Sequence, residues 1–350
     1  MKILISILIT FTLTAQSLAQ ETVTITMANV FGDTPEGRMP GHTGRIQQFI
    51  AKKIDHHTNG QVKWEILRGK QQGGVSVFQS PSLTAKGDII QATNVPAFFL
   101  PRVPEVMIQS IPFLFDGAEH SRRFITSEPA KWMSRKIEDA YGVKVLGHFH
   151  NAAYVSVNGI TPIREPEDFN GKIMNGFDKS WAPMWSNVTP KEIRFIGTQE
   201  AWTGALVNPG SDFDINIGMI QNNHRQRLHE RFKHTTLVTN FYNIFYTMMI
   251  NRDVWEGLTD FQRTGIEKAI AEAQDASVAY QLDTTLWALQ LNQSEGVEMH
   301  IQTSAERERW KAEFYPKMVK AVSDRSSNPS ETLGMIKKIE ALVDDLRWQK

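Results

Sequence analysis

Segments with the residue pattern of β-strands alternate with helical segments along the first third of the chain. Thr22–Ala28 (TVTITMA) is rich in β-branched residues, and Arg45–His57 repeats apolar residues at helical spacing. Further strands are expected at Gln61–Leu67 and Ile89–Thr93, with a short helix that ends at Ala85 between them. Because parallel strands need a crossover between them, this alternation predicts a mostly parallel sheet covered by helices.

The rest of the chain continues this α/β pattern. Strands are expected at Val143–Leu146, Tyr154–Val157 and Phe213–Ile217. Val238–Ile250 (VTNFYNIFYTMMI) is apolar but too short for a membrane span, so we expect a buried strand that crosses between two lobes. Asp260–Asn292 contains no Pro and predicts a helix long enough to lie against both lobes. Its buried side is expected to carry Ile266, Ala269, Ile270, Ala273, Ser277, Tyr280 and Leu286.

The N-terminal residues have the pattern of a secretory signal peptide. Lys2 precedes the apolar run Ile3–Ala15, and the small residues Ser17 and Ala19 occupy the positions expected before a cleavage site. A membrane anchor is the alternative, but the run is shorter than the roughly 20 residues that span a bilayer. We therefore expect residues 1–19 to be removed on export and the mature protein to be periplasmic.

Charge and cysteine content exclude several classes of function. The 38 Lys and Arg residues balance the 38 Asp and Glu residues, so the basic surplus of a nucleic-acid-binding protein is missing. The absence of Cys excludes disulfides, thiol catalysis and Cys-ligated metal centres. A chain of 350 residues with 41% hydrophobic residues is long enough for a sizeable core in two lobes.

Two groups of residues have part of the composition of a metal site. His148 and His150 place two imidazoles on one face of a strand, but no acidic residue nearby supplies a third ligand. Paired surface or interlobe histidines are the favoured interpretation. The segment Asp212–Ile217 resembles the start of a calcium loop, but Ile217 replaces the required Gly and Asn223 the required Glu. A strand with one polar face fits this segment better, and no bound metal is expected.

No motif in the sequence argues for an enzyme. Carboxylates such as Asp212, Asp214 and Glu200 are the groups a glycosidase uses, but any chain of this length offers such pairs. Residues 69–74 (GKQQGG) do not match a dinucleotide fingerprint, and Gly-x-Ser-x-Gly, His-Glu-x-x-His and a Walker loop are absent. We expect neither catalysis nor a cofactor. A secreted hydrolase on the same fold is kept as the alternative, because fold does not fix function.

Several short blocks occur in one order along the chain. They are Phe49–Ile54, Thr58–Val62, Gly73–Gly74, Lys86–Ile89, Ile111–Asp116, Glu119–His120, Pro162–Ile163, Pro166–Ile173, Glu200–Leu206 and Ile250–Arg252. Together they resemble the solute-binding proteins of TRAP transporters, the DctP family, from about Thr22 to Met299. The resemblance implies an α/β, two-lobed fold similar to type II periplasmic-binding proteins, with hinge strands, an interlobe cleft and a long helix along both lobes. Such a receptor captures a small organic solute and delivers it to the small and large subunits of a membrane permease.

The resemblance also suggests how the chain is divided. Lobe I is expected to comprise residues 20–150 and about 239–278, and lobe II about 151–238 and 279–350. A monomer is expected. A receptor that passes its ligand signal to a sensor protein is a further alternative, which the sequence does not separate from transport.

Two arginines of carboxylate-binding family members are replaced in this chain. In Gly171–Asn175 (GKIMN), Met174 stands where the first Arg is usual, or Asn175 does if no gap is allowed; Tyr154 takes the place of the second. A guanidinium holds a carboxylate through two parallel hydrogen bonds, so its loss weakens the case for an acidic ligand.

Aromatic and acidic residues stand near the replaced arginines. They are Tyr154, Phe177, Trp181, Trp185, Trp202, Phe241 and Tyr242, with Asp212, Asp214 and Asn216. An aromatic wall with a carboxylate suits a cationic amine, although core packing also explains such aromatics. Other basic residues that can restore anion binding are Lys70, Lys172, Lys179 and Arg194. An organic acid and a neutral or cationic solute therefore both stay open.

Residues at strand ends are expected to face the ligand, because open α/β sheets bind ligands at the carboxyl ends of their strands. The candidates are Asn29, Phe31, Thr93, Asn94, Tyr154, Met174, Trp202, Asp214, Asn216 and Phe241.

Overall fold

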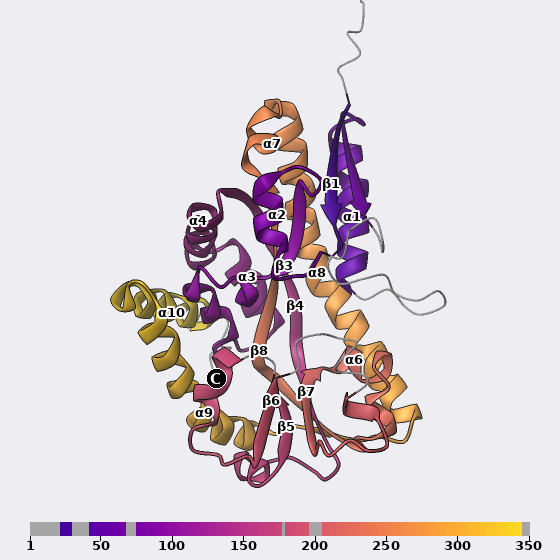
Figure 1. The fold of residues 1–350 in the computed structure, drawn as a ribbon, viewed down its shortest axis with the longest axis vertical. Coiled ribbons are helices and arrows are strands. Elements are labelled where there is room, and N and C mark those ends of the chain that lie inside the picture. The colour runs from indigo at the N-terminus through magenta and orange to yellow at the C-terminus, as the bar shows by residue number, and fades with distance from the viewer. Residues whose placement is uncertain (1–21, 30–41, 68–74, 177–178, 196–204, 345–350) are drawn as a thin grey trace, which may run out of the picture.

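One mixed sheet runs along the whole length of an elongated molecule (Figure 1). The computed structural model describes residues 22–29, 42–67, 75–176, 179–195 and 205–344. Its strands are β1 (Val23–Ala28), β2 (Val62–Leu67), β3 (Ala92–Pro96), β4 (Val143–Gly159), β5 (Ile173–Gly176), β6 (Glu192–Phe195), β7 (Ile215–Met219), β8 (His234–Asn251) and β9 (Glu298–Ile301).

Helices flank this sheet on both faces. They are α1 (His42–His57), α2 (Ser80–Lys86), α3 (Ala118–Thr126), α4 (Glu128–Tyr141), α6 (Ile220–Arg225), α7 (Arg252–Gly257), α8 (Asp260–Ser294), α9 (Ser304–Arg325) and α10 (Pro329–Asp344). Short 3-10 helices are η2 (Ala97–Phe99), η3 (Pro104–Ser110), η4 (Pro166–Phe169), η5 (Lys179–Trp185) and η6 (Leu228–Glu230).

The strand order is β2-β1-β3-β8-β4-β7-β5-β6, with β9 paired to β8. β1 is parallel to β2 and β3, and β5 is parallel to β6 and β7. At the centre, β8 is antiparallel to both β3 and β4, and β4 is antiparallel to β7. The prediction of a mostly parallel sheet is therefore wrong at the centre, where two long strands connect the parallel ends.

β4 is one long strand where the sequence suggested two. The expected strands at Val143–Leu146 and Tyr154–Val157 are joined because the residues between them also pair with β8, for example His148 with Thr247. Gly147 and Ala152 stand at register shifts, which hide the strand pattern in the sequence. The strand that the sequence predicted at Ile89–Thr93 is β3, and it begins later, at Ala92.

In lobe I, α1 and α8 cover one face of β1, β3 and β8. Ile50 of α1 and Ile266 of α8 share a fully buried apolar cluster with Ile25 of β1. A capping box of Thr259 and Gln262 starts α8, which extends beside both halves of the molecule as expected (Figure 1). Leu286 is 62% exposed, so the prediction that it belongs to the buried side of this helix is wrong.

In lobe II, α9 packs on an aromatic core. Trp185 and Phe241 lie there against Phe169, Trp310 and Phe314. The following helix α10 turns back onto lobe I, where it contacts α3 and α4. The C-terminal helices therefore hold the two lobes together on one side of the sheet.

Candidate functional site

The carboxyl ends of the parallel strands in the two lobes face each other. In lobe I, Pro96 at the carboxyl end of β3 pairs with Tyr246 of β8, nearer to lobe II than the pair of Ala92 and Ile250. In lobe II, the carboxyl end of β7 pairs with the middle of β4, and β5 is parallel to β7. The strand ends at which open α/β sheets bind ligands thus meet at one junction between the lobes (Figure 1).

The two strands that cross this junction are irregular there. Ala152 of β4 pairs with Ile244, whereas Tyr154 pairs with Thr239, so β8 has extra residues between these two pairs. Asn240 within that excursion has φ +55°, a left-handed conformation that non-glycine residues seldom adopt. A local irregularity in both crossing strands is a suitable place for the lobes to bend relative to each other.

Lobe I places unpaired polar groups at the junction. Asn94, the middle residue of β3, is 0% exposed, and neither its Nδ2 nor its Oδ1 has a partner in the part of the chain that the structure describes. The hydroxyl of the neighbouring Thr93 is likewise buried without a partner there. Buried polar groups are normally hydrogen-bonded, so these groups are available to a ligand.

β4 adds two buried histidines of different character. The His148 ring bonds to Ser134 Oγ at 2.9 Å and to Thr247 Oγ1 at 3.0 Å. Among the described residues, neither ring nitrogen of His150 has a partner, although its backbone N–H donates to Ser277 of α8. Burial lowers the pKa of each imidazole to about 4, so both are neutral at pH 7. The prediction of surface or interlobe histidines is wrong as to the surface, because both side chains are buried.

Three asparagines form a buried polar group within lobe II. They are Asn175 of β5, Asn216 of β7 and Asn158 of β4, which lie side by side and are all buried. Asn175 Nδ2 has no partner within the described residues. Both lobes therefore contribute uncharged hydrogen-bonding groups at the same junction.

The structure distributes the predicted ligand residues unevenly. Four of them are buried and polar: Asn29 directly after β1, Thr93 and Asn94 in β3, and Asn216 in β7. Met174 and Phe241 belong to a buried apolar cluster that extends over both lobes. Phe31 and Trp202 lie outside the described residues, and Tyr154 is described only as part of the β4 backbone.

Asp214 lies at the amino end of its strand. Its carboxylate accepts the backbone N–H of Ile173, the first residue of β5, at 2.8 Å. Asp212 is paired with Arg194 Nη1 at 2.5 Å. Both carboxylates are thus engaged at the end of the lobe II strands that is opposite to the junction. Asn216, on the predicted polar face of this segment, is 1% exposed, so that face is buried at this position.

Of the predicted aromatic wall, two residues meet at the junction. Trp181 of η5 lies 4.5 Å, ring centre to ring centre, from Tyr242 of β8, and 6.4 Å from Phe98 directly after β3. These contacts join lobe II, the crossing strand and lobe I. Phe177 lies outside the described residues.

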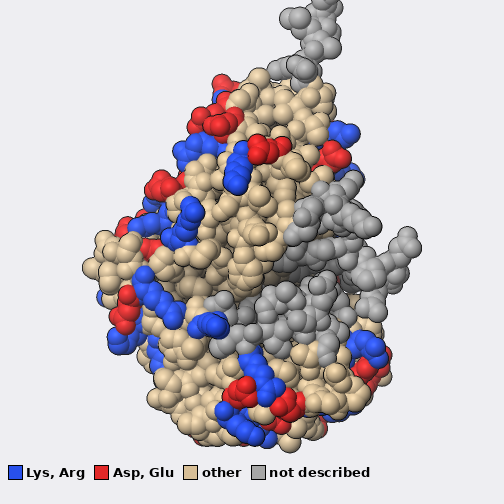
Figure 2. Space-filling model, in the orientation of Figure 1, with Lys and Arg blue, Asp and Glu red and all other residues tan. Residues whose placement is uncertain are grey.

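Basic residues are engaged or exposed where the structure describes them. Arg194 is bound to Glu192 and Asp212, Lys172 reaches Thr161 Oγ1 at the amino end of β5, and Lys179 is exposed. Lys70 lies outside the described residues. Figure 2 shows Lys and Arg intermixed with Asp and Glu over the visible face, without a broad field of one sign. In the described ranges no group of three or more His, Asp or Glu residues is placed to hold a metal ion.

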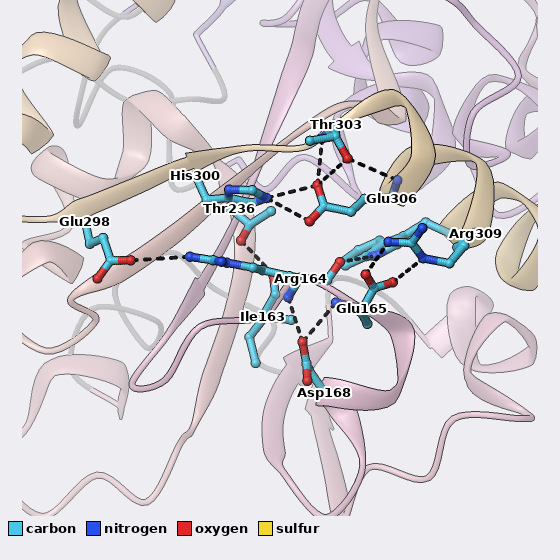
Figure 3. A network of polar contacts seen from close by, with 11 residues as sticks. Ile163, Arg164, Glu165, Asp168, Thr236, Glu298, His300, Thr303, Glu306 and Arg309 are labelled. Atoms are coloured by element: carbon cyan, nitrogen blue, oxygen red, sulfur yellow. Dashed lines mark hydrogen bonds and ion pairs between the residues drawn. The ribbon is translucent and has the colours of Figure 1, made fainter.

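A second polar network lies at the start of α9, and its polar groups have partners among the described residues, unlike several of those at the junction. Glu306 accepts hydrogen bonds from Thr303 and lies 3.0 Å from His300 Nε2 (Figure 3). Glu165 pairs with Arg309 nearby. The polar groups drawn in this network are bonded to one another, so it links β9, η4 and α9 structurally.

Comparison with known proteins identifies the family. The sequence model of "Bacterial extracellular solute-binding protein, family 7" (DctP) matches residues 38–183 and 217–324. The chain belongs to this family. It is thus a solute-binding protein, and the resemblance inferred from the ordered blocks is confirmed.

Individual relatives agree with this assignment. The chain is similar to the "C4-dicarboxylate-binding periplasmic protein DctP" of Rhodobacter capsulatus, at 25% identity over 300 residues, 81% of each chain. A TRAP periplasmic solute-binding protein of Desulfovibrio salexigens with bound orotic acid superposes with a TM-score of 0.78 at 17% identity, covering 93% of this chain and 100% of that one. The corresponding protein of Xanthobacter autotrophicus Py2 with bound β-D-galacturonate has a TM-score of 0.73 at 16% identity, with coverages of 91% and 99%. The expected two-lobed α/β fold is confirmed.

DctP proteins are extracytoplasmic receptors that bind small solutes. Within the ranges that the structure describes, no helix of this DctP protein combines the length and apolar character of a membrane span. The relatives are receptors rather than enzymes.

The sequence analysis missed most of the polar residues at the junction. His150 was considered only as a metal ligand or as a surface or interlobe histidine, Asn175 only as a possible replacement for an arginine, and Asn158 was not considered. The signal was present as Asn in strands that are otherwise apolar, as in Asn158 of VSVNG. Such residues must find partners when buried, and at the end of a strand the partner can be a ligand.

Proposed function

We propose that this protein is the periplasmic receptor of a TRAP-type transporter and that it captures a small, oxygen-rich organic solute between its lobes. The observation that carries the proposal is the set of buried, uncharged polar groups without partners among the described residues, in strands whose carboxyl ends face each other. Asn94 and Thr93 in lobe I and Asn175 in lobe II are the principal members. Their unused donors and acceptors suit hydroxyl, carbonyl and carboxylate oxygens.

The ligand class follows from which charges are present near these groups. A cationic solute would need a carboxylate, but Asp212 and Asp214 are engaged at the opposite end of their strands. Relatives are named for or hold organic acids and sugar acids. We therefore favour a neutral or acidic solute with several oxygen atoms over an amine.

Capture would be accompanied by closure of the lobes around the solute. The irregular crossing strands supply the hinge, and the proposed limits of lobe I and lobe II near residues 150 and 239 fall within or next to that irregular stretch. A solute that binds both lobes stabilises the closed state by its differential affinity for it. The permease subunits would then recognise the closed receptor.

The remaining parts of the proposal concern export, oligomeric state and the membrane partners. Residues 1–19 would be cleaved on export, and the mature receptor would act as a monomer without metal, cofactor or catalytic turnover. Solute delivery to a small and a large membrane subunit would be its task.

A thermal-melt screen of refolded, ligand-stripped protein tests the function. The panel contains orotate, β-D-galacturonate, succinate, neutral sugars and quaternary amines. A ligand at a hundred times its dissociation constant adds about 2.7 kcal/mol of stability, which shifts the melting temperature by several degrees. Stabilisation by amines alone contradicts the proposed ligand class, and turnover of a bound solute contradicts the receptor role.

A variant at the lobe I strand end tests the site. Asn94→Ala removes an amide that has no partner in the described part of the chain, so we expect roughly tenfold weaker binding with little loss of stability. Asn208→Ala is the control, because this exposed residue bonds only within its own turn among the described residues. Equal affinity of the two variants in calorimetric titration would contradict the placement of the site.

A further inference from the structure

The asparagines of lobe II form one transverse row across neighbouring strands. Asn158 of β4 is the register partner of Asn216 of β7, and Met174 pairs with Ile215, which places Asn175 of β5 beside Asn216. Asn223 of α6 covers the far end of the row. All four side chains are at most 2% exposed, so the row is enclosed between the sheet and α6.

Asn223 and Asn158 exchange hydrogen bonds, because Asn158 Nδ2 also donates to Asn223 Oδ1 at 3.1 Å, and from Asn158 onward each amide donates to the next one. Asn223 Nδ2 donates to Asn158 Oδ1 at 2.6 Å, Asn158 Nδ2 to Asn216 Oδ1 at 3.0 Å, and Asn216 Nδ2 to Asn175 Oδ1 at 3.1 Å. Thr235 of β8 also donates to Asn158 Oδ1 at 2.8 Å. Successive hydrogen bonds of one direction polarise each other, so the last amide becomes a stronger donor than an isolated one.

The orientation of that last amide is fixed by the backbone. The N–H of Ile217 donates to Asn175 Oδ1 at 3.1 Å, and a backbone N–H cannot act as an acceptor. A flipped Asn175 would turn its own NH₂ group toward two donors, so the flip is excluded. Nδ2 therefore points away from the row, and it is buried without a partner in the described part of the chain.

This free donor lies beside the junction of the lobes. Asn175 precedes Gly176, the last residue of β5, and the carboxyl end of β5 faces lobe I. On the lobe I side, Asn94 is also uncharged, and both of its side-chain polar atoms are unpaired within the described residues.

We propose that Asn175 is the specificity-determining residue of the receptor and that it binds an acceptor oxygen of the solute through Nδ2, without requiring that oxygen to be charged. Asn216, Asn158 and Asn223 are its positioning residues. The inference rests on the proposed solute-binding function and goes beyond it, because it defines what lobe II recognises: a hydroxyl, carbonyl or amide oxygen as readily as a carboxylate.

The chemistry of the donor gives a measurable signature. A guanidinium at this position would prefer a carboxylate strongly over the corresponding carboxamide, because charge-assisted hydrogen bonds are about twice as strong as neutral ones. With Asn175 as the donor, we expect an acid and its carboxamide to bind within about tenfold of each other.

The first experiment needs no variant. Ligand-stripped wild-type protein is titrated calorimetrically with matched pairs, orotate with orotamide and galacturonate with galacturonamide. Similar affinities within a pair support the inference. An acid that binds more than about a hundredfold tighter than its carboxamide overturns it and leaves the receptor function intact. If no member of the panel binds, the proposed function fails, and the inference fails with it.

The second experiment exchanges only the free atom. Asn175→Asp keeps Oδ1 as the acceptor for Asn216 and Ile217 and replaces the Nδ2 donor by an oxygen. At pH 8, well above the ordinary pKa of an Asp side chain of about 3.9, we expect at least about tenfold weaker binding of the tightest-binding solute. Asn170→Asp is the matched control, because exposed Asn170 also uses Oδ1 as an acceptor, for Thr189, and should stay within about twofold of wild type. Equal affinities of the two variants overturn the inference.

A double-mutant cycle tests whether the row acts through Asn175. Asn216→Leu should weaken binding about fivefold in the wild-type background and less than about twofold in the Asn175→Asp background. A purely structural role of Asn216 would lower the melting temperature and weaken binding equally in both backgrounds. That additive result would remove Asn216 from the set of positioning residues.

Discussion

The two lobes share one sheet but bury different kinds of side chain against it. In lobe I, most residues of β1, β3 and β8 that face α1 and α8 are apolar, such as Ile25, Ala92 and Met248, and Asn94 beside Met248 is a polar exception. In lobe II, Asn158 and Asn216 occupy adjacent strand positions against α6. Apolar burial stabilises a sheet directly, whereas buried amides repay their desolvation only when every partner is present. The difference indicates that lobe I provides stability and that the lobe II row provides geometry.

The strand ends at the junction differ in the same way. Asn94 of lobe I is free at both side-chain atoms within the described residues, and Asn175 of lobe II is held at its oxygen and free at its nitrogen. Lobe I therefore offers an adaptable contact, and lobe II a contact of fixed direction. Recognition would depend more on the fixed one, because a preorganised donor loses less entropy on binding.

The largest expected effect concerns the histidines between the two regions. His148 and His150 have pKa values of about 4 in the folded protein, against about 6.5 when unfolded. Because the unfolded state binds more protons between these values, stability falls as the pH falls from about 6.5 to about 4. At pH 4.5 we expect a loss of roughly 2 to 3 kcal/mol for each histidine, measured by urea unfolding against pH 7.5.

The carboxyl groups whose pKa the fold lowers act at more acidic pH. Burial alone would raise the pKa of Glu105, but hydrogen bonds from Ser327 outweigh it and lower that pKa. The stability that Glu105 contributes is therefore lost only as the pH falls below the pKa that it has in the unfolded chain.

Replacing His150 by Gln tests the effect of the histidines, because it should flatten the dependence of stability on pH between pH 6.5 and 4.5. If the variant keeps the wild-type slope, the histidine is not buried in neutral form.

The second effect concerns the apolar core of lobe I. Ile266→Ala leaves a cavity between α8 and the sheet, where Ile266 is fully buried, so unfolding should become easier by about 2 to 5 kcal/mol. Affinity of the folded protein for its solute should be unchanged, because the residue lies away from the strand ends. A change of affinity without loss of stability would reverse the roles that we assign to the lobes.

The third effect concerns the amide row. Asn158→Ala removes partners from Asn223, Asn216 and Thr235, all of which stay buried. Each unpaired group of this kind costs about 1 to 3 kcal/mol, so we expect a loss of stability together with weaker solute binding. Urea unfolding and calorimetric titration on the same samples separate the two changes. Loss of stability with unchanged binding would show that the row serves lobe II as packing alone.

Much of the fold was predictable because its signals are local. Helical periodicity located α1 and α8, and β-branched residues located β1 and β2. The family was predictable because the order of the blocks survives where single residues change. Strand direction is not a local property, and for that reason Asp214 was expected at the ligand although it lies at the amino end of β7.

The candidate site was less predictable, because hydrogen bonds across strands decide it. Asn175 becomes a directed donor only because the backbone N–H of Ile217 binds its oxygen, which depends on the register between β5 and β7. His148 and His150 are the same residue type on the same side of one strand, yet their rings differ. The His148 ring has two hydrogen-bond partners, and the His150 ring has none among the described residues. Residue type and spacing do not contain these differences.

The smallest expected loss of stability concerns the threonine that caps the start of one helix in each lobe. Thr259 begins α8 at the far end of lobe I, and Thr303 begins α9 in lobe II; each forms a capping box with the residue three positions later. Replacing either by Ala should cost about 1 kcal/mol of stability. Thr303→Ala should cost more, because Glu306 then loses one of the partners that hold it beside His300 (Figure 3). Equal losses measured by urea unfolding would mean that the His300 and Glu306 network adds nothing to the cap and that the two lobes begin these helices alike.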